Sequence, residues 1–387
     1  MSKLTIGIGL IGYEFMGRAH SHAWRSVEAA LETPLEPRLA AICGRDPARL
    51  GAVARRYGWE ATETEWRRVV ERDDVQLIDI CAPNAMHAEP AIAALGAGKH
   101  VLCEKPLAGS LIDAEAMTEA AEAAAAEGVV AMVGFHHRRV PAIALARELI
   151  SLGALGEIRQ VRAAYLQEWP LDPEFPRLWR FVADRAGTGA LGDMASHIID
   201  LAHYLTGQTI RSVSALTETF IEERPLPDDS GRRGPVSVDD AAAFLARFSE
   251  GAIGTFEVTR LAPGHKNSLT LELNGSRGSL RFDVERLNEL EICEVGDARG
   301  EHAFRRILVT EPEHPYIASW WPPGHVLGWE HAFVHQAGDL LRAIADGGEV
   351  RPSFRDGLEV EAVLDAVVRS AGSGEWLDVR ETESEAA

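Results

Sequence analysis

The chain has 387 residues, and 46% of them are hydrophobic, so it is long enough for two domains with ordinary cores. Its formal net charge of −20 argues against nucleic acid and anionic membranes as partners. No apolar stretch reaches the roughly 18 residues of a membrane span, and the N-terminal residues show no signal-peptide pattern. We therefore expect a cytoplasmic protein. The four cysteines lack CxxC spacing, which favours reduced side chains over a disulfide or metal framework.

The first third of the chain alternates short apolar runs with helical segments. In chain order, the patterns predict strand 4–12, a helix ending near residue 30, strands 39–43 and 75–81, helix 87–97, strand 100–103, helix 113–127 and strand 129–135. Strands that alternate with helices of this length are typical of βαβ units. We therefore expect residues 1–134 to form an α/β domain around a parallel sheet.

After about residue 156 the apolar residues recur with the period of strands. The alternating segments are 158–165, 255–259, 269–273 and 279–282, and residues 274–278 between the last two carry a hairpin signal. A helix is expected over 187–205, and the segment 222–240, rich in Pro, Gly and charge, is expected to be a loop. Residues 135–387 are therefore predicted to form an α+β domain with a large, mostly antiparallel open sheet.

A glycine pattern between the first strand and the first helix predicts a dinucleotide site. Gly12-Tyr13-Glu14-Phe15-Met16-Gly17 follows a complete strand and opens a helix, as phosphate binding at a helix N-terminus requires. The overlapping pattern Gly7–Gly12 matches G-x-G-x-x-G on paper but leaves too short a strand before it. Glu14 replaces the middle glycine, and its carboxylate has to point away from a bound pyrophosphate.

The end of the second strand bears on the choice of cofactor. An acidic residue there would accept a hydrogen bond from the 2′-hydroxyl of NAD, but the chain has Gly44 followed by Arg45. A guanidinium without a carboxylate suits a 2′-phosphate, so the cofactor is expected to be NAD or NADP, with a slight preference for NADP. Asp46 is the alternative acidic partner of the ribose.

Three side chains are candidates for proton transfer. Lys105 follows the predicted strand 100–103, at the sheet edge where α/β proteins bind ligands, and Glu104 is placed to hold it. Asp193 and His197 are four residues apart, so a helix would place them on one face, where the carboxylate can orient the imidazole. A metal site of these two residues with His203 is a weaker alternative, and we expect none.

Tryptophans offer flat apolar surfaces on which a sugar ring can stack. Five of the nine fall in or beside predicted loops: Trp169, Trp179, Trp320, Trp321 and Trp329. Core or subunit packing is the commoner role for any one of them. We expect one or two to line a substrate pocket.

Together these motifs resemble the Gfo/Idh/MocA family of oxidoreductases over nearly the whole length. The segments that carry the resemblance are Gly12–His20, Pro83-Asn84 with His87, Ala97–Pro106 and Gly189–Asp200. The resemblance implies a Rossmann domain, a nicotinamide cofactor, a sugar or cyclitol substrate, and a C-terminal open sheet that forms homodimers or homotetramers. It implies that Lys105, Asp193 and His197 are catalytic.

The same resemblance implies further contacts. The cofactor would be held by Gly12, Phe15, Met16, Gly44, Arg45, Pro83, Asn84, His87, Glu104 and Lys105. The substrate would be held by His137, Gln167, Trp169, Trp179, Asp193 and His197.

Three functions fit this sequence. The leading hypothesis is an NAD(P)-dependent dehydrogenase that oxidises a ring hydroxyl of a sugar, anhydrosugar or cyclitol to a ketone. The alternative is a nicotinamide-dependent glycosidase that works by transient oxidation, elimination, water addition and re-reduction, with His136 or His137 as the additional base. A non-catalytic sensor of the cofactor would need the fold but not Lys105, Asp193 and His197.

Overall fold

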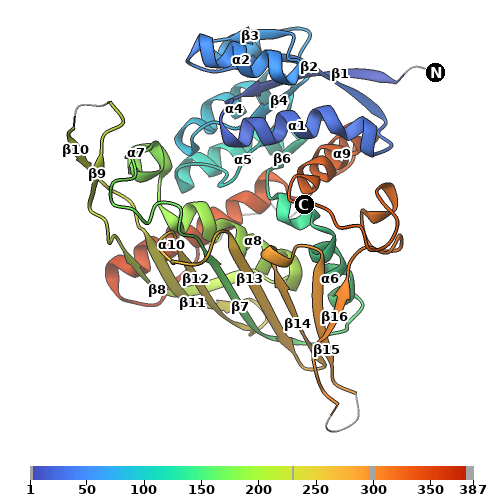
Figure 1. Cartoon of the computed structure of the whole chain (residues 1–387), viewed down its shortest axis with the longest axis vertical. Coiled ribbons are helices and arrows are strands. Elements are labelled where there is room, and N and C mark those ends of the chain that lie inside the picture. The colour runs from blue at the N-terminus through green and yellow to red at the C-terminus, as the bar shows by residue number, and fades with distance from the viewer. Residues whose placement is uncertain (1–2, 229–230, 297–300, 381–387) are drawn as a thin grey trace. The chain divides into compact units, whose positions relative to one another are not determined.

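The computed structural model describes residues 3–228, 231–296 and 301–380, and within these no helix is long and apolar enough to cross a membrane. The chain forms two compact units (Figure 1). Unit 1 comprises the residues up to 139 together with 328–358, and unit 2 comprises 140–327 and the residues from 359 onward. The predicted division into 1–134 and 135–387 differs from this in one main respect, because residues 328–358 belong to unit 1.

Unit 1 is built on a six-stranded sheet in which every pair of neighbouring strands is parallel. The strands, in spatial order, are β3 (Ala61–Glu63), β2 (Leu35–Cys43), β1 (Leu4–Ile11), β4 (Leu77–Ile80), β5 (His100–Cys103) and β6 (Ala131–Val133). This is the strand order of doubly wound dinucleotide-binding domains. The predicted parallel α/β fold is confirmed.

The described residues of unit 1 form six helices, three of which were not predicted. The six helices are α1 (Phe15–Ala30), α2 (Pro47–Tyr57), α3 (Trp66–Val70), α4 (Ala88–Gly96), α5 (Leu111–Ala125) and α9 (His331–Asp346). Helices α2, α3 and α9 and the strand β3 occupy residues for which the sequence analysis gave no element. Helix α9 packs on α1 so closely that a Cβ at Gly338 would lie 2.6 Å from a methyl carbon of Leu31, which explains why this late segment belongs to unit 1.

Unit 2 is built on a nine-stranded sheet. The strands, in spatial order, are β16 (Arg305–Leu308), β15 (Glu289–Glu294), β14 (Gly278–Asp283), β13 (Ser268–Gly275), β7 (Ile158–Leu166), β12 (Ile253–Thr259), β11 (Ala241–Phe248), β8 (Ile210–Glu218) and β17 (Leu377–Asp378). Among the described strands of this sheet, only β7 and β12 pair in parallel. The predicted mostly antiparallel sheet is confirmed.

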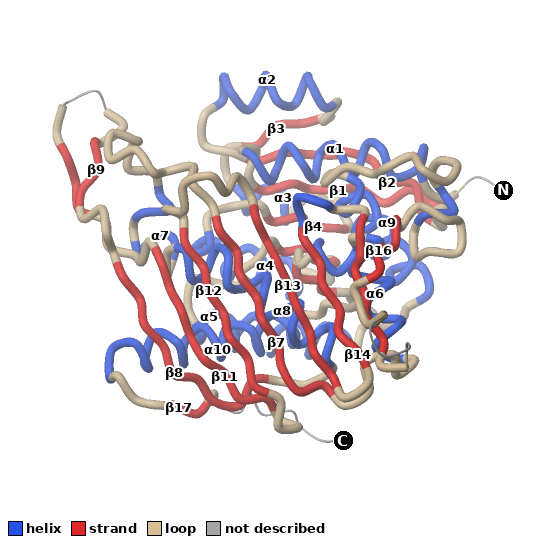
Figure 2. Tube along the Cα trace, turned by 60° about the horizontal axis from the view of Figure 1, so that its bottom comes forward, coloured by secondary structure: helices blue, strands red, loops and turns tan. Residues whose placement is uncertain are grey.

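Helices cover one face of the large sheet (Figure 2). They are α6 (Pro141–Ser151), α8 (Ser196–Thr206) and the part of α10 (Phe354–Ser373) that belongs to unit 2. Along β11 and β12 buried residues alternate with exposed ones, as expected for a sheet with one packed and one open face.

Two predicted elements of unit 2 need correction. The helix expected over 187–205 is interrupted: α7 (Ala183–Ala186) ends before Gly187, residues Leu191–Ala195 form a π-helical turn, and α8 follows. In this segment Gly189 lies directly against the backbone of Asp239, an approach that only glycine allows. The loop expected over 222–240 contains a small antiparallel hairpin of β9 (Glu223–Pro225) and β10 (Arg233–Pro235).

Candidate active site

The turn between β1 and α1 has the steric constraints of a dinucleotide-binding loop. Gly12 has a φ of +103°, and a Cβ on it would lie 2.5 Å from the carbonyl oxygen of Cys81. A Cβ on Gly17 would lie 2.0 Å from the carbonyl oxygen of Gly12, so the helix can start this close to the strand only with glycine there. Gly7 and Gly9 lie inside β1, as expected if Gly12–Gly17 is the functional pattern.

The N-terminus of α1 is suited to an anion. Glu14, the residue before the helix, makes no capping hydrogen bond with its own side chain. Its carboxylate instead forms an ion pair with Arg49 of α2, at 2.8 Å between Oε1 and the guanidinium. The first N–H groups of a helix are without intrahelical partners and attract phosphate. The glycine turn at Gly12 and the N-terminus of α1 together fit the pyrophosphate of a dinucleotide.

The end of β2 explains the glycine at the expected ribose position. A Cβ on Gly44 would lie 2.0 Å from the ring of Tyr13, so the aromatic ring occupies the space that an acidic side chain would need. The alternative acid, Asp46, caps α2 by accepting hydrogen bonds from the N–H groups of Ala48 and Arg49 at 2.9 and 3.2 Å. Arg45 is exposed.

The residues after β4 are organised by a buried histidine. Pro83 precedes a 3₁₀ turn, Asn84–Met86, and Asn84 is buried. The His87 ring is fully buried and lies with Nε2 2.9 Å from the carbonyl oxygen of Ala82 and Nδ1 3.1 Å from that of Pro106. His87 therefore joins the loops that follow β4 and β5, and its contact with the cofactor stays a prediction.

The candidate base Lys105 follows a glutamate that is buried against a histidine. Glu104 directly follows β5 and is 3% exposed. Its Oε1 lies 2.9 Å from Nε2 of His20 in α1, and its Oε2 accepts a hydrogen bond from the backbone N–H of Lys105 at 3.2 Å. The expected support of Lys105 by Glu104 thus acts on the backbone.

Aromatic rings form a continuous group beside this edge of unit 1. Phe15 stacks on Trp329 with ring centroids 5.5 Å apart, Trp329 meets Phe333 edge to face at 4.6 Å, and Phe333 stacks on His136 at 4.1 Å. His137 lies beside His136, with 4.2 Å between the ring centroids. Phe15, expected at the cofactor, is 54% exposed and Met16 is half-buried, so the open side of the group lies at the glycine turn.

Both histidines of this group are buried and weakly basic. Burial and the positive charge of Lys105 lower the pKa of His137 to about 3. Burial, followed by His137 and Lys105, lowers the pKa of His136 well below its usual value. At neutral pH both rings are therefore uncharged and poor proton acceptors.

In unit 2, the segment around Asp193 is anchored by an aspartate from another part of the chain. Asp239 accepts hydrogen bonds from the backbone N–H groups of Gly189 and Leu191, both at 2.7 Å. Burial raises the pKa of Asp239, and these two donors partly offset that effect. A Cβ on Gly189 would lie 1.8 Å from the Asp239 carbonyl oxygen, so this approach requires glycine. The π-helical turn that follows contains Asp193.

A buried arginine fixes the carboxylate of Asp193. Arg260 is 1% exposed, and its Nη2 lies 3.0 Å from Oδ2 of Asp193 and 3.0 Å from the carbonyl oxygen of Gly189. Its Nη1 donates to the carbonyl oxygen of Arg180 at 3.2 Å. His197 lies in the first turn of α8 and is buried. Asp193 and His197 therefore lie in adjoining turns, as their spacing indicated, although the first turn is π-helical.

A polar group at the end of β7 lies beside His197. The rings of Tyr165 and His197 are 5.9 Å apart. Asn267 Oδ1 accepts hydrogen bonds from the Tyr165 hydroxyl at 2.8 Å and from Nε2 of Gln167 at 2.6 Å. Burial and the negative charge of Asp193 raise the pKa of Tyr165, so the phenol stays protonated. Gln167 thus belongs to the same group as the candidate acid–base residues of unit 2.

The two tryptophans expected at the substrate have different surroundings. Trp169 packs against Phe175 and Phe181, with ring centroids at 5.2 and 5.6 Å, as part of a small apolar cluster. The Arg180 guanidinium lies 4.4 Å from the ring centre of Trp179. Trp169 therefore packs in a cluster that includes Val236 and Val238 from a later segment, and its contact with substrate stays a prediction. His203, named in the metal alternative, accepts the N–H of Ile210 through Nε2 at 3.1 Å.

Sequence reasoning missed four residues that organise these groups: His20, Asp239, Arg260 and Asn267. His20 lies in the motif Gly12–His20 and was noted only as part of the resemblance. Arg260 and Asn267 carry no local signal, since their partners are distant in the sequence.

The comparisons with known proteins agree with this arrangement. Residues 6–135 match the model "Oxidoreductase family, NAD-binding Rossmann fold", and residues 143–281 match "GFO/IDH/MocA C-terminal domain". The levoglucosan dehydrogenase of Pseudarthrobacter phenanthrenivorans is 41% identical over 97% of this chain and 98% of its own.

Two solved structures are similar throughout. An oxidoreductase domain protein from Kribbella flavida is 56% identical, with a TM-score of 0.95 over 98% of this chain and 100% of its own. Levoglucosan dehydrogenase in complex with NADH and levoglucosan is 42% identical, with a TM-score of 0.93 over 97% of this chain and 100% of its own. On this evidence the chain belongs to the Gfo/Idh/MocA family of oxidoreductases.

Proposed function

We propose that the protein is an NAD(P)-dependent dehydrogenase that oxidises a ring hydroxyl of a sugar, anhydrosugar or cyclitol to a ketone. The relation to levoglucosan dehydrogenase over 97% of the chain carries this proposal. The glycine turn at Gly12 and Gly17 and the N-terminus of α1 support the cofactor class. Nicotinamide, when bound, supplies the hydride acceptor.

The chain's own residues handle the proton of the hydroxyl. We assign Lys105 and His197 as the groups that exchange this proton, because they are the two candidate bases that the sequence motifs identify. Asp193, held by Arg260 at 3.0 Å, is a fixed carboxylate that orients the neighbouring polar groups. Gln167 and the Tyr165 hydroxyl, both on Asn267, offer hydrogen bonds to further substrate hydroxyls.

For the cofactor we propose NAD(H). The related complex contains NADH, and the preference for NADP that the sequence suggested rests on the exposed Arg45 and on the missing acid at Gly44. Tyr13 accounts for the glycine without any 2′-phosphate. The sequence preference for NADP therefore has no independent support.

The first experiment follows reduced-cofactor absorbance for a panel of pyranoses, anhydrosugars and cyclitols with each cofactor. We expect sugar-dependent reduction with a higher kcat/KM for NAD than for NADP. A reversed ratio that Arg45→Ala abolishes would restore the NADP assignment. Absence of reduction with every sugar, in protein that binds NADH, would contradict the dehydrogenase.

The low basicity of His136 and His137, the proposed additional bases, disfavours the glycosidase alternative. That route needs an additional base, and the pKa of His137 is lowered to about 3 and that of His136 is also lowered. Both are therefore poor acceptors for an acidified C–H proton. Release of an aglycone from aryl glycosides without net cofactor reduction would reverse this conclusion.

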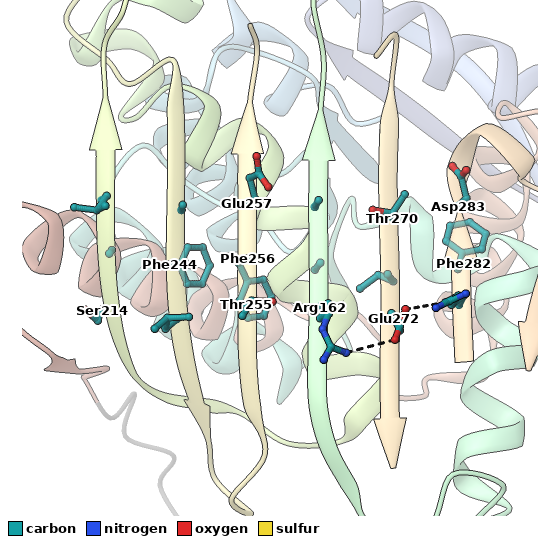
Figure 3. Close-up of a pocket in the computed structure, with 18 of the residues that line it drawn as sticks. Arg162, Ser214, Phe244, Thr255, Phe256, Glu257, Thr270, Glu272, Phe282 and Asp283 are labelled. Carbon is teal, nitrogen blue, oxygen red and sulfur yellow. Dashed lines mark hydrogen bonds and ion pairs between the residues drawn. The ribbon is translucent and has the colours of Figure 1, made fainter. Parts of the chain in front are cut away.

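We also propose that the protein is a homodimer or homotetramer that associates through the open face of the large sheet. This face carries a hollow of about 940 Å³ across several strands, with Arg162, Glu272, Glu257 and Thr255 among its lining (Figure 3). Apolar side chains also lie on these strands and are exposed: Leu216 by 74%, and Leu245 and Ile253 by 50% each. Exposed apolar area of this kind is typical of a surface that another chain covers.

Replacing Leu245 with Glu is expected to shift the protein toward its monomer mass of 42.1 kDa, because a buried carboxylate without a partner opposes association. Light scattering after size exclusion measures the mass. Leu152→Glu is the matched control, since Leu152 is 83% exposed and lies at the end of α6, away from the sheet face. Equal masses for both variants would exclude this face as the interface.

A further inference from the structure

A histidine bridges two buried carboxylates, one of which belongs to Glu104, the residue before the candidate base Lys105. Nδ1 of His20 lies 2.9 Å from Oδ1 of Asp79, and its Nε2 lies 2.9 Å from Oε1 of Glu104. The three residues come from α1, β4 and the end of β5, and their exposed fractions are 1%, 0% and 3%. A neutral imidazole carries one N–H, so only the protonated ring can donate to both carboxylates.

The surroundings of the ring favour the protonated form. Burial lowers the pKa of His20, but Asp79, followed by Cys81, outweighs it and raises the pKa well above its usual value. Burial also raises the pKa of the Cys81 thiol. Burial and the neighbouring positive charges lower the pKa of His136, so that ring is uncharged. The geometry agrees with a protonated His20, because each ring nitrogen lies 2.9 Å from a carboxylate oxygen.

Each carboxylate is held by a second group. The Trp24 indole donates to Oδ2 of Asp79 at 2.7 Å. Oε2 of Glu104 accepts the backbone N–H of Lys105 at 3.2 Å. A Cβ on Gly134 would lie 2.8 Å from Oε1 of Glu104, so that carboxylate is confined between the His20 ring and the glycine backbone.

We propose that His20 is a positioning residue: its imidazolium fixes Glu104, and Glu104 in turn fixes the backbone from which the Lys105 side chain extends. The chain of contacts runs from α1 through two carboxylate oxygens to the reacting edge of the sheet. The inference rests on the proposed role of Lys105. The positive charge of the His20 imidazolium also balances part of the negative charge of Asp79 and Glu104.

The same side chains allow one competing interpretation. A nitrogen of His20, a carboxylate oxygen of Asp79 and the sulfur of Cys81 lie within 4.8 Å of one another and could hold a metal ion. The 2.9 Å contact between His20 and Asp79 is a hydrogen-bond distance, and the indole of Trp24 already occupies the other oxygen of Asp79. We therefore assign the cluster as a hydrogen-bonded charge network.

The test compares His20→Gln with Trp24→Phe in the full-length protein with bound cofactor. Both variants remove one hydrogen bond to Asp79, but only the first removes the contact to Glu104. We expect His20→Gln to lower kcat by up to about 100-fold with little change in the KM for the sugar, since small displacements of a reacting group are this costly. We expect Trp24→Phe to reduce thermal stability and to leave kcat close to wild type.

The pH profile separates positioning from folding. Loss of the imidazolium removes a positive charge next to the reacting edge of the sheet, which opposes the loss of a proton there. The acid limb of kcat/KM for sugar oxidation is therefore expected to move to higher pH in His20→Gln and to stay in place in Trp24→Phe. In the wild type, ¹⁵N spectra should show two ring N–H signals for His20 at pH 8, a measurement that requires no variant.

The outcomes are distinct. An unshifted profile and near-normal kcat in folded His20→Gln, with Lys105→Met inactive, would overturn the inference and leave the proposed function intact. Full activity of Lys105→Met would instead contradict the role of Lys105 on which the inference rests, and absence of sugar-dependent reduction by the wild type would contradict the proposed function. A single ring N–H on His20 at pH 8, or stoichiometric metal by elemental analysis of the purified protein, would also overturn the inference.

Discussion

Replacing Lys105 with Met is expected to lower kcat by about 10²–10⁴-fold, the range for removal of a general acid or base. Methionine keeps most of the apolar stem and removes the ammonium group, so the backbone contact of Lys105 to Glu104 is retained. Steady-state turnover at saturating cofactor and sugar measures the loss. Thermal midpoints with and without NADH show whether the variant still folds and binds its cofactor.

A second lysine near the same strand provides the control. Lys99 precedes β5, at the end opposite Lys105, and its Nζ donates to the carbonyl oxygen of Arg72 at 2.7 Å. Lys99→Met is expected to lower stability and to leave kcat nearly unchanged. A Lys105→Met variant that turns over within a few-fold of wild type would remove Lys105 from the proton-transfer step.

The sequence was sufficient to predict the architecture because both units have strongly periodic patterns. In unit 1, apolar strands separated by helical segments specify parallel pairing, and the glycines at 12 and 17 mark a turn where backbone atoms approach closely. In unit 2, the alternation of buried and exposed residues in strands such as β11 and β12 specifies a sheet with one open face.

Several elements were missed for different reasons. Helices α2 and α9 have apolar residues at helical spacing, and α2 also has an Asp46 cap and Pro47 at its first position, so they were overlooked although the sequence carries their signals. Strand β3 has three residues, none of them buried, and gives no such signal. The interruption of the helix at 187–205 depends on Asp239, which binds the N–H groups of Gly189 and Leu191 from a distant part of the chain. No local pattern could have indicated it.

The residues of the candidate site also fall into two groups, those that the sequence indicated and those that only the structure shows. Lys105 follows a recognisable strand, and Asp193 and His197 share a helical spacing, so all three were visible in the sequence. Their supporting partners were not. His20 is 59 residues from Asp79 and 84 from Glu104, and such contacts arise only from the order of strands in the folded sheet.

The second large effect is expected at Arg260. Arg260→Met would remove the ion pair with Asp193 and the hydrogen bonds to the carbonyl oxygens of Gly189 and Arg180. Because the arginine is buried and two backbone carbonyl oxygens lose their donor, we expect the free energy of unfolding to fall by about 1–3 kcal/mol, the cost of leaving buried acceptors unsatisfied. Denaturant titration measures it. Released from Arg260, the Asp193 carboxylate is no longer fixed beside α8, so kcat/KM should fall as well.

The effect on activity has to be separated from the effect on stability. Arg224 is a matched control, because it is also fully buried and donates to backbone carbonyl oxygens, those of Pro170 and Asp172, with no contact to Asp193. Arg224→Met should therefore destabilise the protein with a smaller loss of kcat/KM. If Arg260 acts through Asp193, its loss should add little to kcat/KM in an Asp193→Asn background, because residues in one network are not additive. Fully additive losses in this double-mutant cycle would show that Arg260 only supports the fold, and that the geometry of Asp193 is set by the π-helical turn itself.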